Sequence, residues 1–124
     1  MLLVCRFRPD AGDGLVERAR LALELLTAQP GCLDGTLAQA TDEPDAWLLV
    51  ARFESVAAYR RAMSPFPIRE HVAPLLAGAL ADEPSVYELR LHATGGEVAE
   101  FESLIARDAG TVRLGEAAGP STPR

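Results

Sequence analysis

The chain has 124 residues, 48% of them hydrophobic and 24% charged, which is the composition of a soluble globular protein of one domain. Its formal net charge of −6 argues against a surface for nucleic acid or an anionic membrane, because either would need a basic patch. All 12 basic residues are arginine, so chemistry that needs a lysine, such as Schiff-base formation, is excluded.

Targeting signals and cysteine usage indicate where the protein works. No apolar run approaches the ~18 residues of a membrane helix, and the run that follows Met1 is too short for a signal peptide. The two cysteines, Cys5 and Cys32, do not make a disulfide framework. We therefore expect a cytoplasmic protein.

The first half of the chain predicts a strand, a helix and two more strands. Residues 2–8 alternate apolar and other side chains, residues 14–28 show helical spacing, and residues 33–40 read as a second strand. The third strand, residues 46–53, is apolar on both faces. Helices cover only one side of such a sheet, so the other side needs a partner sheet. We expect a homodimer whose interface contains Leu48, Val50, Val4 and Val86.

A second helical stretch, from residue 56 to about residue 80, contains two prolines near its middle. The sequence SPFP at residues 64–67 removes backbone donors and restricts the preceding residues, so we expect a kink or a break there. A break above the sheet opens space beneath it. We therefore expect a cavity at this point, lined by Phe53, Tyr59, Phe66, His71 and residues of the first and last strands.

The last predicted strand spans residues 85–92 and turns Tyr87, Leu89 and Leu91 toward the helices. The order β-α-β-β-α-β over residues 1–92 predicts a ferredoxin-like α+β domain, with a four-stranded antiparallel sheet and two helices on one face. Residues 93–124 form a C-terminal extension. We expect a linker at residues 93–96, a short amphipathic helix that presents Val98, Phe101, Leu104 and Ile105, and a flexible end at residues 115–124.

Three side chains are candidates for catalysis. A neutral His71 facing a pocket can take or deliver a proton near neutral pH, although a partly solvated, inert histidine at the edge of the helix's apolar stripe fits the pattern better. Tyr59 and Tyr87 can each donate a hydrogen bond to a substrate oxygen. The alternative for both tyrosines is core packing with the hydroxyl reaching the rim of the core.

Aromatic residues are candidates for substrate binding, and metal binding is not expected. An aromatic-lined cavity for a planar ligand would be formed by Phe7, Trp47, Phe53 and Phe66, and the alternative is that these residues belong to the ordinary core. The two histidines, His71 and His92, lie on different elements without a second ligand at local spacing, so we expect no metal site.

Several segments resemble the antibiotic biosynthesis monooxygenase family of the dimeric α+β barrel superfamily. They are PGC at residues 30–32, DEPDAWLLVARFESVAAYRRAMS at 42–64, REH at 69–71 and DEPSVYE at 82–88. The resemblance covers about residues 1–92. It implies a homodimer with face-to-face sheets and a pocket in each subunit between sheet and helices. Members include cofactor-independent oxygenases of anthrones and quinols from aromatic polyketides, and haem-degrading enzymes.

The chain departs from the family pattern at two points. Oxygenating members often use an asparagine and a tryptophan at the pocket, whereas this chain has no asparagine and has Phe53 where the tryptophan is common. Haem cleavage is disfavoured for the same reason. Tyr59 and His71 fall where the family places helix residues that face the pocket.

Two functions of different classes follow from these observations. The first is a cofactor-independent monooxygenase of a small aromatic, polyketide-like substrate, with molecular oxygen as co-substrate. The second is a non-catalytic dimeric module that binds a small hydrophobic molecule or serves a structural role.

Overall fold

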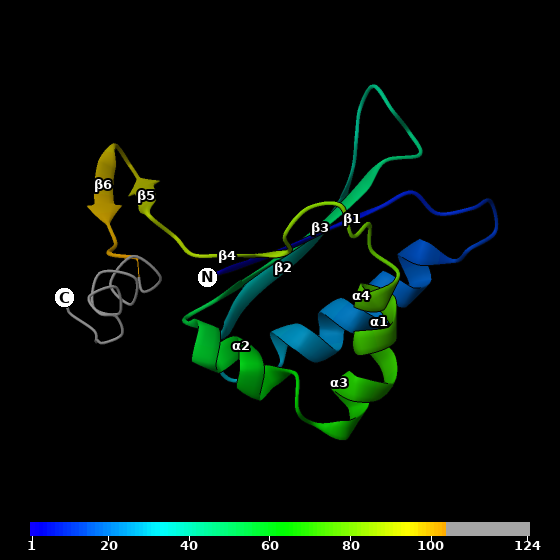
Figure 1. Cartoon of the computed structure of the whole chain (residues 1–124), viewed down its shortest axis with the longest axis horizontal. Helices are drawn as coiled ribbons and strands as arrows, with labels where there is room; N and C mark the ends of the chain where they lie inside the picture. The colour runs from blue at the N-terminus through cyan, green and yellow to red at the C-terminus, as the bar shows by residue number, and fades with distance from the viewer. Residues whose placement is uncertain (104–124) are drawn as a thin grey trace, which may run out of the picture. The chain divides into compact units, whose positions relative to one another are not determined.

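The computed structural model describes residues 1–103, and the described chain forms an α+β fold around one antiparallel sheet (Figure 1). The elements in chain order are β1 (Leu2–Phe7), α1 (Leu15–Thr27), β2 (Cys32–Gln39), β3 (Trp47–Phe53), α2 (Val56–Ala62), α3 (Phe66–His71), α4 (Ala73–Ala77), β4 (Val86–Tyr87), β5 (Leu91–Thr94) and β6 (Glu97–Glu100). The four-stranded sheet has the order β2-β3-β1-β4, which confirms the predicted ferredoxin-like topology.

The chain divides into two compact units, Met1–Tyr87 and a second that starts at Glu88, and each is described by itself. The predicted domain boundary at residue 92 stays a prediction, since it marks where the resemblance to a family ends. Within residues 1–103, no helix combines the length and the apolar character that crossing a membrane requires.

The core of the first unit lies between the sheet and the helices, which all cover one face of it (Figure 1). Leu3, Cys5 and Phe7 of β1 are buried, and the first two lie opposite the buried Ala51 and Leu49 of β3. The helices contribute apolar side chains at helical spacing, among them Leu26 of α1 and Ile68 of α3, both fully buried. This packing confirms the predicted orientation of the central strands.

The predicted break in the second helical stretch is confirmed, and a further break follows it. Helix α2 begins at the N-cap Ser55, whose hydroxyl accepts a hydrogen bond from the Ala58 amide at 3.0 Å, and it ends before the extended Pro65. Helices α3 and α4 each carry a proline in the first turn, where the missing amide donor costs nothing. The prolines therefore divide one long helix into three short ones.

The last strand of the sheet differs from its prediction in length and in register. Strand β4 has two residues, and its pairing places Val86 opposite Leu3 on the helix side and Tyr87 opposite Leu2 on the outer side. The sequence analysis expected the reverse. Period two fixes only which residues share a face, and a slip by one residue turns every side chain over. The register follows instead from a hydrogen bond between the Val4 amide and the Ser85 carbonyl, at 2.7 Å.

Residues 91–100 form a β-hairpin instead of the expected linker and helix. Strand β5 pairs antiparallel with β6, and the turn between them contains Gly95 and Gly96 at φ of 59° and 84°. Hairpin turns of two residues favour glycines because both positions need positive φ. The predicted helix is therefore wrong at Val98. The rest of that prediction, Leu104 and Ile105 together with the flexible end, lies outside the described residues.

Candidate functional site

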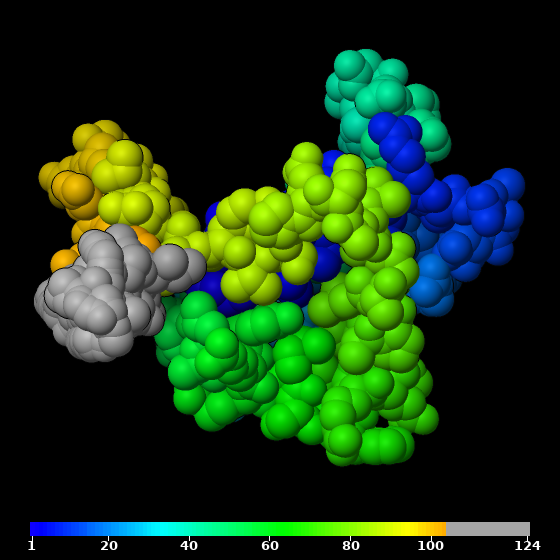
Figure 2. Space-filling model, viewed as in Figure 1, coloured from blue at the N-terminus to red at the C-terminus, as the bar shows by residue number. Residues whose placement is uncertain are grey.

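A pocket of about 370 Å³ lies between the sheet and the helical layer of the first unit. Leu3 and Cys5 of β1 form one wall, Tyr59 of α2 and Leu76 of α4 form another, and residues 79–85 close the third side. We call residues 79–85 the mouth segment. In Figure 2, β1 (dark blue) is visible at the bottom of a hollow between the green α2 region and the yellow-green chain that leads to β4.

Tyr59 is the hydroxyl donor of this pocket. Its ring packs edge-to-face against Phe53, with centroids 5.3 Å apart and an interplanar angle of 72°, so the fully buried Phe53 fixes the tyrosine from behind. Burial raises the pKa of Tyr59, and the neighbouring Cys5 raises it further. The hydroxyl is therefore protonated at neutral pH. Among residues 1–103, no group forms a hydrogen bond with it, so it can donate to a ligand.

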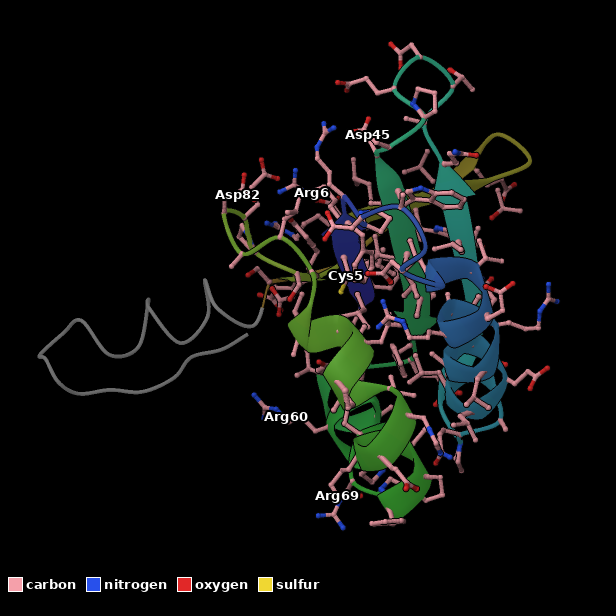
Figure 3. All side chains as sticks on the ribbon, turned by 90° about the vertical axis from the view of Figure 1, so that its right-hand side faces the viewer. Cys5, Arg6, Asp45, Arg60, Arg69 and Asp82 are labelled. Atoms are coloured by element: carbon pink, nitrogen blue, oxygen red, sulfur yellow. The ribbon has the colours of Figure 1, made fainter. Side chains whose placement is uncertain are left out.

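Cys5 adds a thiol to the pocket wall, and its sulfur is visible between β1 and the helices in Figure 3. Burial raises the pKa of this thiol. Because the thiolate is the nucleophilic form, a buried thiol of this kind is chemically quiet. Cys5 therefore serves as part of the apolar lining.

The mouth segment is tied to β1 at both ends and in the middle. The Leu80 amide donates to the Arg6 carbonyl at 2.8 Å, and the Ser85 carbonyl accepts from Val4. Between these points the Arg6 guanidinium contacts Asp82 at 2.9 Å and Glu83 at 3.2 Å. Figure 3 shows the side chains of Arg6 and Asp82 close together at the edge of the sheet.

Glu83 is a pocket residue that the sequence analysis missed. It lies in an irregular segment between a helix and a short strand, where no periodicity assigns a side chain to a face. A signal was nevertheless present in the sequence, because Arg6 belongs to a strand whose alternate residues are apolar, and two acidic residues, Asp82 and Glu83, immediately precede the strand that pairs with it.

His71 and Phe66 lie away from this pocket. The imidazole of His71 is 44% exposed and lies 3.5 Å from a carboxylate oxygen of Glu70, and Phe66 is 64% exposed. The structure therefore does not bring these two side chains to this pocket, and a cavity lined by them stays a prediction. His71 follows Ile68 by three residues and precedes Leu75 by four, a spacing that places it at the apolar stripe of a continuous helix. Helix α3 ends at His71 and α4 begins two residues later, so only the spacing from Ile68 is measured along one helix.

The other predicted residues occupy different places. Phe7 and Trp47 line a second pocket, of about 270 Å³, together with Arg6, Arg8 and Leu48 at the far end of β1.

Tyr87 lies on the outer side of the sheet, and its hydroxyl donates to the Pro84 carbonyl at 2.9 Å. Of the predicted site residues, the structure thus brings Tyr59, with Phe53 behind it, to the pocket of about 370 Å³. The catalytic and binding roles of the predicted residues stay predictions. Within the described part of the chain, no three His, Cys, Asp or Glu side chains cluster as metal ligands would.

Comparisons with known proteins identify similar sequences and structures. The family model described as antibiotic biosynthesis monooxygenase matches residues 2–66. A variant of SnoaB from Streptomyces nogalater, described as a cofactor-independent oxygenase, is 22% identical, with a TM-score of 0.56 over 64% of this chain and 82% of that chain.

Two further solved structures are described as putative antibiotic biosynthesis monooxygenases. The protein from Chloroflexus aurantiacus is 25% identical, with a TM-score of 0.51 over 66% of this chain and 84% of its own. The protein from Nitrosomonas europaea is 13% identical, with a TM-score of 0.53 over 67% and 87%. These structures establish the likeness of the fold. Among curated proteins, none matches the sequence.

Proposed function

We propose, since the chain belongs to the antibiotic biosynthesis monooxygenase family, that it oxygenates a small aromatic substrate with O2 and without a cofactor. The substrate class is an anthrone or quinol of the polyketide type. The description of SnoaB as a cofactor-independent oxygenase supports the proposal at the level of the shared fold.

The observation that carries the proposal is the pocket around Tyr59. Its volume of about 370 Å³ lies within the range of small-molecule sites, and its lining combines apolar side chains with an almost equal share of polar surface. Tyr59, whose protonated hydroxyl has no hydrogen-bond partner among the described residues, belongs to this lining. Such a pocket fits a flat, largely uncharged ring system with an oxygen substituent that accepts the tyrosine hydrogen bond.

The chemistry follows from loss of a proton by the substrate. An electron-rich phenol or anthrone that loses a proton becomes an anion, which can pass an electron to O2. Negative charge develops on the substrate oxygen as the proton leaves, before the electron passes to O2, and a preorganised donor such as Tyr59 stabilises that charge more in the transition state than in the ground state. Apolar side chains beside the donor strengthen such an interaction to the extent that they keep water away from it.

Oxygen consumption by the purified full chain tests the proposal. We expect uptake with at least one member of a panel of anthrones and hydroquinones, above the rate of their autoxidation in buffer. In Tyr59→Phe we expect kcat to fall by about 10²-fold, the typical cost of one lost oxyanion donor. Binding should persist in this variant, because Phe retains the ring that packs on Phe53.

His71→Ala serves as the matched control for the loss of a polar side chain. Because the imidazole is exposed and lies outside the pocket, its removal should leave oxygen uptake unchanged. Tight binding of the aromatic panel without any uptake would contradict the oxygenase and favour the non-catalytic binding module. Undiminished turnover in Tyr59→Phe would remove Tyr59 from the mechanism.

A further inference from the structure

We propose that Glu83 accepts the proton that the substrate loses, and that Arg6 positions the Glu83 carboxylate at the pocket mouth. This inference rests on the proposed oxygenase function and adds to it the residue that starts the reaction. It replaces the histidine expected from the sequence with a carboxylate from a different element.

Four of the described residues that line the pocket carry polar side chains. These residues are Cys5, Tyr59, Glu83 and Ser85. The thiol and the phenol have pKa values raised by burial, so both hold their protons. A carboxylate paired with a guanidinium has acceptor oxygens only. Glu83 is therefore the lining group suited to take a proton from a bound phenol or anthrone.

The Arg6 guanidinium holds the Glu83 carboxylate. One guanidinium nitrogen of Arg6 lies 3.2 Å from a Glu83 oxygen and 2.9 Å from an Asp82 oxygen. Arg6 is fixed in turn by the ladder of β1 with β3 and by its own carbonyl, which accepts from Leu80. A charged donor held on a rigid strand limits the positions that the carboxylate can adopt, and this is the requirement for efficient proton transfer.

The Glu83 carboxylate is also open to solvent. Glu83 is among the residues that line the pocket, and its side chain is 57% exposed, so bulk water reaches the carboxylate. An accepted proton can therefore leave to solvent between turnovers. A small carboxylate added to the buffer can also reach the same place when the side chain is removed.

The proposed step balances in atoms and electrons. A C–H bond of the anthrone or an O–H bond of the quinol breaks, the electron pair stays on the substrate, and the proton forms an O–H bond with Glu83. The substrate anion then reduces O2, the oxidant of the proposed function. For an anthrone, the resulting hydroperoxide loses water to give the ketone, and the proton held by Glu83 or one from solvent completes that water.

Chemical rescue of a truncated variant tests the proposal on the full chain. In Glu83→Ala we expect kcat with the best quinol or anthrone to fall by 10²- to 10⁴-fold, the usual contribution of a general base. Added acetate should restore turnover in proportion to its concentration. Glu70→Ala is the matched control, because Glu70 is a similarly exposed carboxylate that does not line the pocket. Its turnover should equal that of the wild type, with or without acetate.

The role of Arg6 is tested by separating kcat from KM. In Arg6→Gln, Glu83 is retained but loses its charged partner, so kcat should fall while KM stays close to the wild-type value. A rise in KM at unchanged kcat would show that Arg6 shapes the pocket and does not position the base.

The absorption spectrum of a bound phenol tests the role of Glu83 without depending on oxygenase activity. The absorption band of bound, un-ionised 4-nitrophenol should move to longer wavelength when its hydroxyl donates to a carboxylate. We expect the shift in the wild type and in Glu70→Ala and its loss in Glu83→Ala. A shift without oxygen uptake contradicts the proposed function and retains Glu83 as the acceptor. Absence of the shift in the wild type, or a loss of turnover in Glu83→Ala that acetate does not restore, would overturn the inference.

Discussion

Gly31 shows how one residue controls the approach of two elements. It has a φ of +86°, a conformation that residues with a Cβ rarely adopt, and its carbonyl accepts a hydrogen bond from the Glu54 amide at 2.8 Å. A Cβ at this position would lie 2.6 Å from the Cβ of Ala58 in α2. The turn into β2 can therefore pass against α2 only because this residue has no side chain.

Gly31→Ala should consequently lower the free energy of unfolding by about 2–4 kcal/mol, from the left-handed backbone and the forced displacement of α2 together. Gly12→Ala is the matched control, since Gly12 has a φ of +80° but nothing lies within 4 Å of the added Cβ. Gly12→Ala should lower the free energy of unfolding by about 1–2 kcal/mol, the cost of the left-handed backbone conformation alone. Urea denaturation followed by circular dichroism measures both values, and equal losses would contradict the contact with Ala58.

The direction of a side chain in the candidate site could be predicted from the sequence where the residue belongs to a regular helix or strand. Tyr59 follows the N-cap Ser55 in an unbroken helix, so its direction toward the sheet follows from helical spacing. His71 lies beyond the proline break, where the phase of the helix is reset, and its direction could not be extrapolated. Glu83 lies in an irregular segment whose path is set by hydrogen bonds to β1, which no local pattern reveals.

Among the elements, β2 contains a bulge that an ion pair accompanies. The pairing of β2 with β3 shifts between Cys32 and Asp34, and Asp34 then faces Arg52 across the strands. The guanidinium donates from Nε and from Nη2 to the two Asp34 oxygens at 2.8–3.1 Å. These hydrogen bonds lower the pKa of Asp34 from its usual value, although both side chains are partly exposed to solvent.

The lowered pKa of Asp34 makes its contribution to stability dependent on pH. A carboxyl whose pKa is lower in the folded state stabilises the fold above its unfolded pKa, about 3.9, and the contribution disappears as the pH falls through the folded value. Asp34→Asn should therefore be less stable than the wild type at pH 7, and the difference should vanish in strong acid. Urea midpoints compared at pH 7 and below pH 3 measure the effect, and a pH-independent difference would exclude the ion pair as its cause.

The positions of the helices and strands could be predicted from the sequence where the hydrophobic pattern repeats over a long segment. Strands β1 and β3 and helix α1 each repeat their period several times, and the structure has them where the pattern places them. Strand β4 has two residues and no period, so its register depends on the contacts of the mouth segment. The hairpin at residues 91–100 was missed because an apolar spacing that fits a helix also fits a short strand with paired glycines before it.

For the molecule as a whole, the outer face of the sheet, opposite the helices, is the surface that bears on assembly. Leu2 and Val4 of β1 and Leu48 and Val50 of β3 alternate with the core residues and lie on the face opposite the helices, only half-buried within the described chain. Contiguous apolar surface of this kind marks an association site. A second copy of the sheet would cover it, and the corrected register brings Tyr87 rather than Val86 to that face.

We expect the full chain to sediment as a dimer of about 26.6 kDa, twice its 13.3 kDa, at micromolar concentration. Leu48→Glu would place a charge in the apolar interface and should yield a folded monomer. Leu21→Glu is the control, because Leu21 is a partly exposed leucine on α1, in the helical layer. It should stay dimeric, and a wild type that sediments at 13.3 kDa would contradict the predicted interface.

The attachment of the mouth segment couples ligand access to the exchange of one backbone hydrogen. The amide of Val4 donates to Ser85 in the mouth segment, although Val4 itself lies inside a strand that is paired along its whole length with β3. Local opening of a segment requires less free energy than global unfolding. Each lifting of the mouth segment therefore exposes this amide to solvent while β1 stays paired with β3, so the deuterium uptake of Val4 records how often the pocket opens.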